Sequence, residues 1–186
     1  MKLNIKKRAI AKKGDRTQTR LEDRIPAVLY GKNTESEPIS IDKAEFGALM
    51  RSLKSGRLAT TVLTLVDEDG KERQALAKDI QYQVTTYNVQ HLDFQEVEQT
   101  TVVNVNVPID FTGAADCAGV KLGGFLRPVI RKLRVRCEVE KLPSSFSIDV
   151  RKMGIKQSKR LSDIDIPEGV RPMMDLKQVA VVVAKR

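Results

Sequence analysis

The sequence is poor in the residue types that build membrane spans, metal centres and base-stacking surfaces. It has no tryptophan, aromatic residues make up 4% of its 186 residues, and it contains one histidine and two cysteines. No apolar run approaches the roughly 18 residues that a membrane-spanning helix requires. A structural zinc site usually takes four close Cys or His ligands. We therefore expect no metal site and no cofactor.

Nucleotide-binding and targeting signals are also missing. The glycine-rich stretch 113–124 has no following Lys-Ser/Thr pair and lacks the strand–helix context of a dinucleotide site. The basic start, Met1 to Gly14, leads into no apolar stretch, so we expect no signal peptide and a cytoplasmic location. In a cytosolic chain, Cys117 and Cys137 are most simply small buried residues.

The charge of the chain is unevenly distributed. The formal net charge is +9; residues 1–32 hold ten Lys/Arg against three Asp/Glu, residues 33–99 seven against twelve, and residues 100–186 sixteen against nine. A basic leading segment indicates a localised contact with a polyanion. A solvated surface or anionic lipid would also fit this charge, although no basic amphipathic helix is visible.

Alternating apolar and polar residues predict strands along most of the first half. A turn at 67–70 joins two of them as a hairpin. The expected strands are 2–6, 25–30, 60–66 and 73–77. One helix is clear: Asp42 can cap it, Glu45 can complete a capping box, and Gly56 can end it. Its apolar face consists of Phe46, Leu49, Met50 and Leu53.

The pattern changes after Glu98, and we predict a first domain at 1–96 and a second, mostly β domain at 97–186. Strict alternation from Val129 to Val139 predicts a half-buried antiparallel strand with Cys137 on its buried face. Glycines make 113–124 a loop or a series of tight turns. Further strands are expected at 103–109, 146–150 and 179–183.

The residue types of the first half favour RNA as the polyanion. Arginine can hold a phosphate through two parallel hydrogen bonds, and tyrosine offers a ring for stacking and a hydroxyl for a ribose 2′-OH. So few aromatic residues suit an RNA that is read by its shape. Tyr30 is the candidate tyrosine, and Gly14 lets the backbone approach the RNA closely. The candidate phosphate contacts are Arg8, Lys12, Lys13, Arg16, Arg20, Arg24 and Lys32.

His91 and Asp93 are expected to form a pair, because alternate residues of a strand point to the same side. Such a pair could serve general acid–base catalysis, but no serine or cysteine nearby completes a triad. A hydrogen-bonded structural pair or an RNA contact is the simpler interpretation. We therefore expect the chain not to be an enzyme.

Three groups of residues resemble one known family, in the same order and along nearly the whole chain. The groups are Arg24-Ile25-Pro26-Ala27-Val28-Leu29-Tyr30-Gly31, then Lys78-Asp79-Ile80-Gln81-Tyr82 with His91-Leu92-Asp93-Phe94, and in the second half Val107-Pro108-Ile109, 119–124, Leu142-Pro143 and Ile148-Asp149-Val150. The chain is similar to the bacterial large-subunit ribosomal proteins numbered twenty-five, in their longer two-domain form, the general stress protein Ctc type.

The resemblance implies a mostly β chain with a few helices, in which an N-terminal antiparallel β-barrel binds the loop E region of 5S ribosomal RNA. It implies a structural, non-catalytic role in the large ribosomal subunit, a second, mostly β domain, and no small-molecule substrate. We expect the second domain to contact neighbouring ribosomal RNA or ribosomal proteins. Together with the residue types, it gives as RNA-binding candidates Arg8, Lys13, Gly14, Arg20, Tyr30, Gln81, His91 and Asp93.

Three other functions stay open at this point. The chain could be a stress-linked factor that joins the ribosome conditionally, an RNA-processing enzyme that uses His91 and Asp93, or a detached anticodon-binding-type barrel. In the second half, residues 121–160 hold twelve Lys/Arg against three Asp/Glu. That stretch fits a contact with ribosomal RNA, a contact with a neighbouring protein, or a solvated face.

Overall fold

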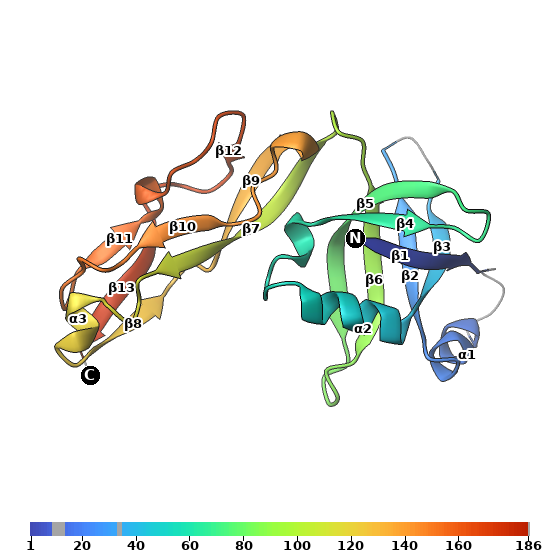
Figure 1. The fold of residues 1–186 in the computed structure, drawn as a ribbon, viewed down its shortest axis with the longest axis horizontal. Helices are drawn as coiled ribbons and strands as arrows, with labels where there is room; N and C mark the ends of the chain where they lie inside the picture. The colour runs from blue at the N-terminus through green and yellow to red at the C-terminus, as the bar shows by residue number, and fades with distance from the viewer. Residues whose placement is uncertain (9–13, 33–34, 186) are drawn as a thin grey trace. The chain divides into compact units, whose positions relative to one another are not determined.

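A computed structural model describes residues 1–8, 14–32 and 35–185 of the chain (Figure 1). Contacts divide the chain into two compact units, Met1–Thr101 and Val102–Arg186. Val97 is buried, and its N–H donates to the Gln74 carbonyl at 2.9 Å, so it packs with the first unit. The domain limits predicted from the sequence, 1–96 and 97–186, stay a prediction. Within the described ranges, none of the helices has the length and apolar character to cross a membrane.

The first unit is a closed barrel with the strand order β1-β3-β2-β6-β5-β4. The neighbours are antiparallel, apart from β1 with β4 and β2 with β6, which run parallel. Closure gives each barrel strand a partner on both sides, which removes the free edge that an open sheet would expose. The strands are β1 (Lys2–Lys7), β2 (Arg24–Tyr30), β3 (Glu37–Asp42), β4 (Val62–Val66), β5 (Glu72–Tyr82) and β6 (Val89–Glu96).

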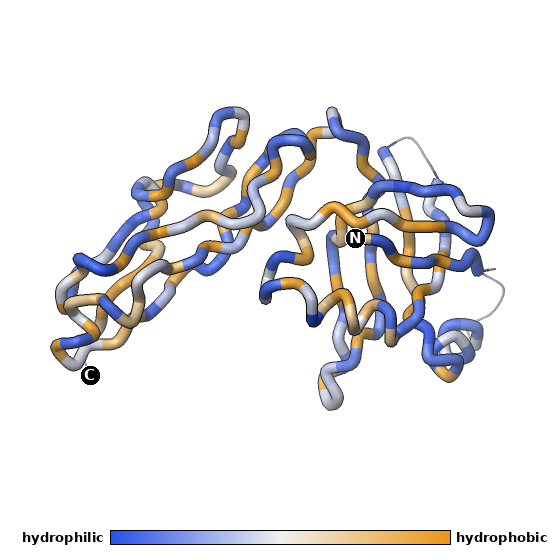
Figure 2. Tube along the Cα trace, viewed as in Figure 1, coloured by the Kyte–Doolittle hydropathy of each residue, from blue (hydrophilic) through white to orange (hydrophobic). Residues whose placement is uncertain are grey.

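Alternation along the strands places one set of side chains inside the barrel. In β1, Leu3 and Ile5 are at most 1% exposed, whereas Lys2, Asn4 and Lys6 face solvent. Figure 2 shows the same alternation of hydrophobic and hydrophilic residues along the barrel strands. Each fully buried Leu or Ile contributes about 1.5–3 kcal/mol of hydrophobic stabilisation. The predicted mostly β fold with an N-terminal barrel is confirmed.

The predicted helix is α2 (Lys43–Ser52), which buries Phe46 and Leu49 in the barrel core. Asp42 caps it as expected, since its carboxylate accepts hydrogen bonds from the N–H groups of Ala44 and Glu45 at 2.8 and 3.0 Å. The capping box was wrong: Glu45 instead accepts from the backbone and side-chain nitrogens of Asn4, both at 3.1 Å. The helix also ends at Ser52, before Gly56.

A second helix of the barrel unit is α1 (Asp15–Leu21). It buries none of its residues, so the sequence carries no apolar stripe that would reveal it. The Gly14 carbonyl accepts hydrogen bonds from Thr17 and Gln18, both at 3.0 Å, and so starts the helix. A 3-10 turn, η1 (Leu58–Thr60), precedes β4, so the strand predicted at 60–66 begins at Val62.

The second unit contains a four-stranded sheet, β10-β7-β9-β12, and a three-stranded sheet, β11-β13-β8. Its strands are β7 (Val102–Thr112), β8 (Gly124–Pro128), β9 (Lys132–Glu138), β10 (Phe146–Asp149), β11 (Ser158–Arg160), β12 (Arg171–Pro172) and β13 (Val179–Lys185). Short helical turns α3 (Ala118–Lys121), η2 (Val139–Lys141) and η3 (Leu161–Asp163) join them.

The glycine-rich stretch 113–124 is not all loop, because it contains the single turn α3. Gly119 lies so close to its neighbours that a Cβ there would come within 2.8 Å of a Val183 methyl and 2.9 Å of the Gly154 carbonyl carbon. The glycine therefore serves close packing of this turn against β13, a role that local sequence does not distinguish from a flexible turn.

The predicted alternating strand of the second unit is confirmed as β9. Leu133, Val135 and Cys137 are at most 2% exposed, and β9 is antiparallel to β7 and β12. Both cysteines are buried free thiols, as expected. Burial raises the pKa of the Cys137 thiol, with a further contribution from the charge of Glu138. The Cys117 thiol donates to the Met153 carbonyl at 3.3 Å.

A buried carboxylate, Asp67, stands at the start of the turn between β4 and β5. Its side chain is 2% exposed and lies 3.0 Å from Lys7 Nζ and 3.6 Å from Arg73 Nη2. It also accepts a hydrogen bond from the Glu68 N–H at 2.9 Å. Burial alone would raise the pKa of Asp67, but the bonds from Lys7 and Glu68 and the charge of Arg73 outweigh it and hold the pKa below its ordinary value.

We predict that Asp67→Asn lowers the free energy of unfolding at neutral pH by about 1–3 kcal/mol, because it removes a charged partner of a buried group. A depressed pKa means that this stabilisation is present above the ordinary pKa of 3.8 and is lost as the pH falls below it. Urea unfolding at neutral and acidic pH measures both effects.

The matched control is Asp69→Asn, an exposed position in the same turn, which we expect to change stability by less than about 0.5 kcal/mol. If Asp67→Asn behaves like this control at neutral pH, the buried ion pairs do not stabilise the barrel.

Candidate nucleic-acid interface

The outer face of three neighbouring strands, β5, β6 and β2, collects four of the predicted site residues. Gln81 lies opposite His91 across the β5–β6 pair. Asp93 lies beside Val28 of β2, two residues before Tyr30. Leu92 and Phe94, which alternate with His91 and Asp93 on β6, are fully buried and face the barrel core. His91 and Asp93 therefore project outward, because successive side chains of a strand alternate.

His91 and Asp93 are in direct contact, as their spacing along one strand predicts. Nδ1 of His91 lies 2.8 Å from Oδ1 of Asp93, and the two side chains are 18% and 35% exposed. The contact fixes the ring through Nδ1 and leaves Nε2 as the nitrogen for another partner. The pair is thus held in one orientation while remaining accessible.

Tyr30 ends β2 beside Gln95 of β6. Partial burial raises the pKa of its hydroxyl, and the negative charges of Asp93 and Asp79 raise it further. The phenol is therefore neutral at physiological pH and lies in the field of both carboxylates. A neutral hydroxyl can both donate and accept a hydrogen bond.

Arg20 connects the helix α1 to this face. Its Nη2 donates to the carbonyl of Gln90 at 3.2 Å, one residue before His91. The residue is exposed, and its guanidinium has further N–H donors. A cation from a helix that lies 70 residues away in sequence thus borders the His91–Asp93 pair.

Arg8, just after β1, belongs to a cluster of positive charge. Its Nε donates to the Ile39 carbonyl at 3.1 Å. Burial lowers the pKa of its guanidinium, and the charges of Arg16 and Arg20 lower it further against an opposing effect of Asp15. Since like charges raise each other's energy, an anion bound here would relieve that repulsion.

The other predicted RNA contacts differ in their exposure and in the hydrogen bonds that they already form within the fold. Arg24 donates from Nε to the Ser40 hydroxyl at 3.1 Å and from Nη2 to the Ser40 carbonyl at 3.0 Å, so part of its guanidinium holds β2 to β3. Lys32 is exposed. Gly14 has a φ of −72°, which any residue adopts, and open space where a Cβ would lie. Lys12 and Lys13 lie outside the described residues.

Comparison with known proteins places the chain among ribosomal proteins. The model of the ribosomal L25p family matches residues 3–94, and that of the ribosomal protein TL5 C-terminal domain matches residues 102–186. Proteins named large ribosomal subunit protein bL25 from Chlamydia trachomatis serovar A and Chlamydia muridarum are each 46% identical, over 100% of both chains. The one from Chlamydia pneumoniae is 42% identical, again over both full lengths.

The chain belongs to the ribosomal L25p family.

The family resemblance drawn from the sequence motifs, including the long two-domain form, is therefore confirmed. In this member of the family, the second motif group, 78–82 with 91–94, forms the antiparallel pair β5–β6. The first group, 24–31, supplies β2, which lies parallel to β6. Two of the motif groups thus meet on the same face of the barrel.

Asp79 is a member of this face that sequence reasoning missed. It lies opposite Asp93 because the register shifts between Ala77 and Asp79. Two carboxylates therefore face each other beside the Tyr30 hydroxyl. Alternation along 72–82 alone gives no sign of this shift, because an irregularity in pairing depends on the partner strand.

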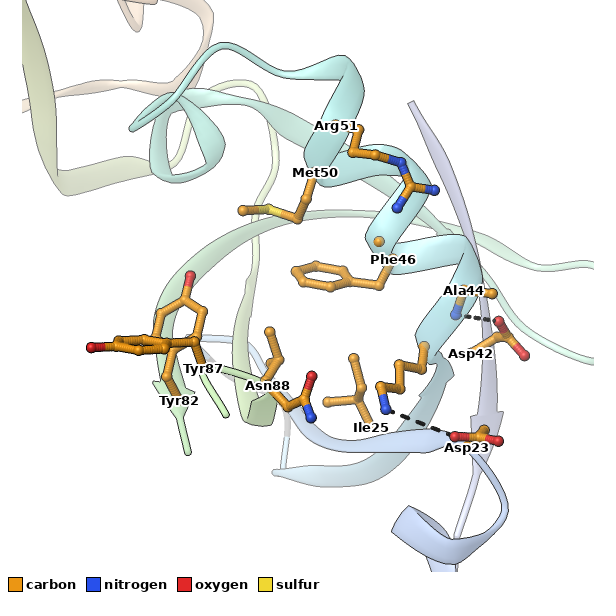
Figure 3. Close-up of a pocket in the computed structure, with 13 residues that line it drawn as sticks. Asp23, Ile25, Asp42, Ala44, Phe46, Met50, Arg51, Tyr82, Tyr87 and Asn88 are labelled. Atoms are coloured by element: carbon orange, nitrogen blue, oxygen red, sulfur yellow. Dashed lines mark hydrogen bonds and ion pairs between the residues drawn. The ribbon is translucent and has the colours of Figure 1, made fainter. Parts of the chain in front are cut away.

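A pocket lies between α2 and the far end of the β5–β6 hairpin. Figure 3 shows Phe46 pointing into it, with Tyr82 and Tyr87 on one side. Its carboxylates serve the fold: Asp42 caps α2, and Asp23 lies 3.8 Å from Lys43 Nζ. The pocket therefore presents no acid–base pair that would suggest catalysis.

We predict that Asp93→Asn lowers the pKa of Tyr30 toward its ordinary value of 10.0, because the substitution removes a neighbouring negative charge. Burial and Asp79 still act, so part of the elevation remains. Tyrosinate absorbance, followed through an alkaline pH titration, reports the change.

The control is Tyr30→Phe, which removes the contribution of Tyr30 from the absorbance titration and so assigns it. A Tyr30 titration that does not move in Asp93→Asn would show that the hydroxyl does not sense the Asp93 carboxylate.

Proposed function

We propose that the barrel unit binds the loop E region of 5S ribosomal RNA. The contact surface in this proposal is the outer face of β5, β6 and β2, together with α1 and the end of β1. His91 and Asp93 lie at its centre, and Arg8 and Arg20 lie at its basic side.

The broader role follows from the family. The chain is a structural protein of the large ribosomal subunit, because both halves match ribosomal protein families and relatives of that name match it from end to end. It is not an enzyme, and its location is the cytoplasm, with the ribosome. His91 and Asp93 therefore do not form the active site of an RNA-processing enzyme.

The observation that carries the proposal is the gathering of different hydrogen-bonding groups on one face. The Gln81 amide offers donors and an acceptor, His91 offers Nε2, Asp93 offers carboxylate oxygens, and Tyr30 offers a hydroxyl. Such groups suit base edges and ribose hydroxyls, which carry the information in RNA recognition. A surface that only attracted phosphates would need cations alone.

The arginines lie on α1 and at the end of β1, next to the hydrogen-bonding side chains of the three strands. The charges of Arg16 and Arg20 act on Arg8, and Arg20 donates a hydrogen bond to the backbone of β6. Contacts of arginine with phosphates supply affinity and orientation, while base contacts supply specificity. In this proposal, α1 and the end of β1 supply the phosphate contacts. The strands β5, β6 and β2 supply the base contacts.

Asp93 provides the sharpest test, since a carboxylate in an RNA-binding face opposes binding unless it makes a specific contact. We predict that Asp93→Ala weakens binding to a loop E fragment by about 1–3 kcal/mol, because it leaves His91 Nδ1 and the RNA group that contacts Asp93 unpaired in the complex. Simple electrostatics predicts the opposite sign. Fluorescence anisotropy of the labelled fragment measures it, with a thermal melt to confirm folding.

The matched control is Asp69→Ala, which removes one carboxylate from an exposed turn and should leave specific binding unchanged or slightly tighter. Equal or tighter binding by a folded Asp93→Ala protein removes Asp93 from the proposed site.

The domain assignment has its own test. We predict that the fragment 1–101, the first compact unit, binds loop E as the full chain does. About four to six phosphate contacts would give a log–log salt slope of roughly −3 to −5. A folded fragment that prefers loop E no more than an unrelated RNA duplex would contradict the assignment. A slope near zero would remove the arginine cluster from the site.

A further inference from the structure

One side of β9, in the four-stranded sheet of the second unit, is strongly basic. Along β9, Lys132, Arg134 and Arg136 are exposed, while the residues between them are buried. Basic residues that are scattered through the sequence of this segment thus line up on one side of a single strand. Residues two apart on a strand lie about 6.6 Å from each other.

The strands on either side extend this face. Asn106 lies opposite Arg134, and Asn104 lies opposite Arg136, both on β7. On the other side of β9, Arg171 of β12 lies directly opposite Arg136. We call Lys132, Arg134, Arg136, Arg171, Asn104 and Asn106 the β9 face; all six side chains are exposed.

Two carboxylates lie near the β9 face: Glu138 follows Arg136 on the same side of β9, and Asp110 is on the exposed side of β7. Among the ion pairs formed between described residues, none includes Lys132, Arg134, Arg136 or Arg171. Glu138, at the end of β9, lies 3.2 Å from Lys141, and Asp149 of β10 lies 2.7 Å from Arg151. Glu138 and Asp149 are therefore engaged by other cations.

Like charges directly opposite each other on neighbouring strands destabilise a sheet. Arg136 and Arg171 form such a pair, and Arg134 adds a third charge two residues along. An unfavourable arrangement that local structure does not compensate is typical of a functional surface. An anionic partner would turn this repulsion into attraction.

We propose that the β9 face is a second RNA-binding surface, which contacts the phosphate backbone of ribosomal RNA outside the segment bound by the barrel. The proposal rests on membership of the large ribosomal subunit, where RNA is the abundant polyanion, and does not depend on recognition of loop E.

The composition of the face favours RNA over an acidic protein or a lipid surface. Arginine forks bind phosphates in pairs of parallel hydrogen bonds, and asparagine amides can reach sugars and phosphates. The cores of protein interfaces are enriched in aromatic residues and methionine, and lipid-bound faces insert apolar side chains. The six residues of the β9 face are all polar, and the exposed apolar side chain on the same side of β7, Val102, lies beyond them, opposite Glu138.

The test uses the full chain with three neutral substitutions, Arg134→Gln, Arg136→Gln and Arg171→Gln. The control carries Lys152→Gln, Lys177→Gln and Lys185→Gln, which remove the same charge from exposed positions of the same unit. The probes are a short RNA duplex without loop E, a loop E fragment, vesicles with anionic lipid, and polyglutamate.

We expect the β9-face variant to bind the duplex about tenfold more weakly near physiological salt, with a log–log salt slope shallower by about 2 to 3. The loss of duplex affinity in the control variant should be less than half as large on a logarithmic scale. The affinity of the β9-face variant for the loop E fragment should stay within about twofold of that of the unaltered chain. The affinity of the unaltered chain for loop E tests the barrel proposal separately. A failure of that proposal is therefore distinguishable from a failure of the β9-face proposal.

Equal losses in both variants would overturn the proposal, because net charge alone would then explain them. A loss of vesicle or polyglutamate binding without a loss of duplex binding would overturn it in favour of another partner.

Removing the Arg136–Arg171 repulsion should leave the melting temperature unchanged or higher. Independently of any variant, the duplex should shift amide resonances of β9 and β12 in the unaltered chain; unmoved resonances there would also overturn the proposal.

Discussion

The parallel pairing of β2 with β6 is the constraint on which the candidate RNA face depends. It places Val28 beside Asp93 and so brings Tyr30 next to the His91–Asp93 pair. A slip of one residue in this register would turn Leu92 and Phe94, both fully buried, toward solvent and would bury His91 and Asp93. The hydrophobic core of the barrel therefore fixes the position of the polar face.

Both units hold like charges close together. In each unit, the stability of the hydrophobic core offsets the repulsion between these charges. The pKa of Arg8 is lowered by burial and by the charges of Arg16 and Arg20, while Arg136 faces Arg171 across a strand pair. Closed or stacked sheets with buried aliphatic cores tolerate such local repulsion. In a large ribosomal subunit protein, the concentration of positive charge on one face of each unit agrees with the RNA contacts proposed for that unit.

The sequence by itself determined the features that depend on neighbours within a few residues. A period of two identified β9 and placed Cys137 in the core, and the same period predicted that His91 and Asp93 share one side of a strand. A short acidic side chain before a helix-forming segment identified Asp42 as a cap. The family motifs gave the barrel and the second β domain, because their order and spacing span the chain.

Only the tertiary structure decided what lies opposite what. The helix α1 has no buried face and therefore no periodic signal in the sequence. Its Arg20 is positioned by a hydrogen bond to the Gln90 carbonyl of β6. Glu45 forms its hydrogen bonds with Asn4 rather than with its own helix start. Asp79 meets Asp93 through an irregular strand register. Each of these contacts joins segments that are distant in the chain or paired irregularly, and local patterns of hydrophobicity hold no information about such partners.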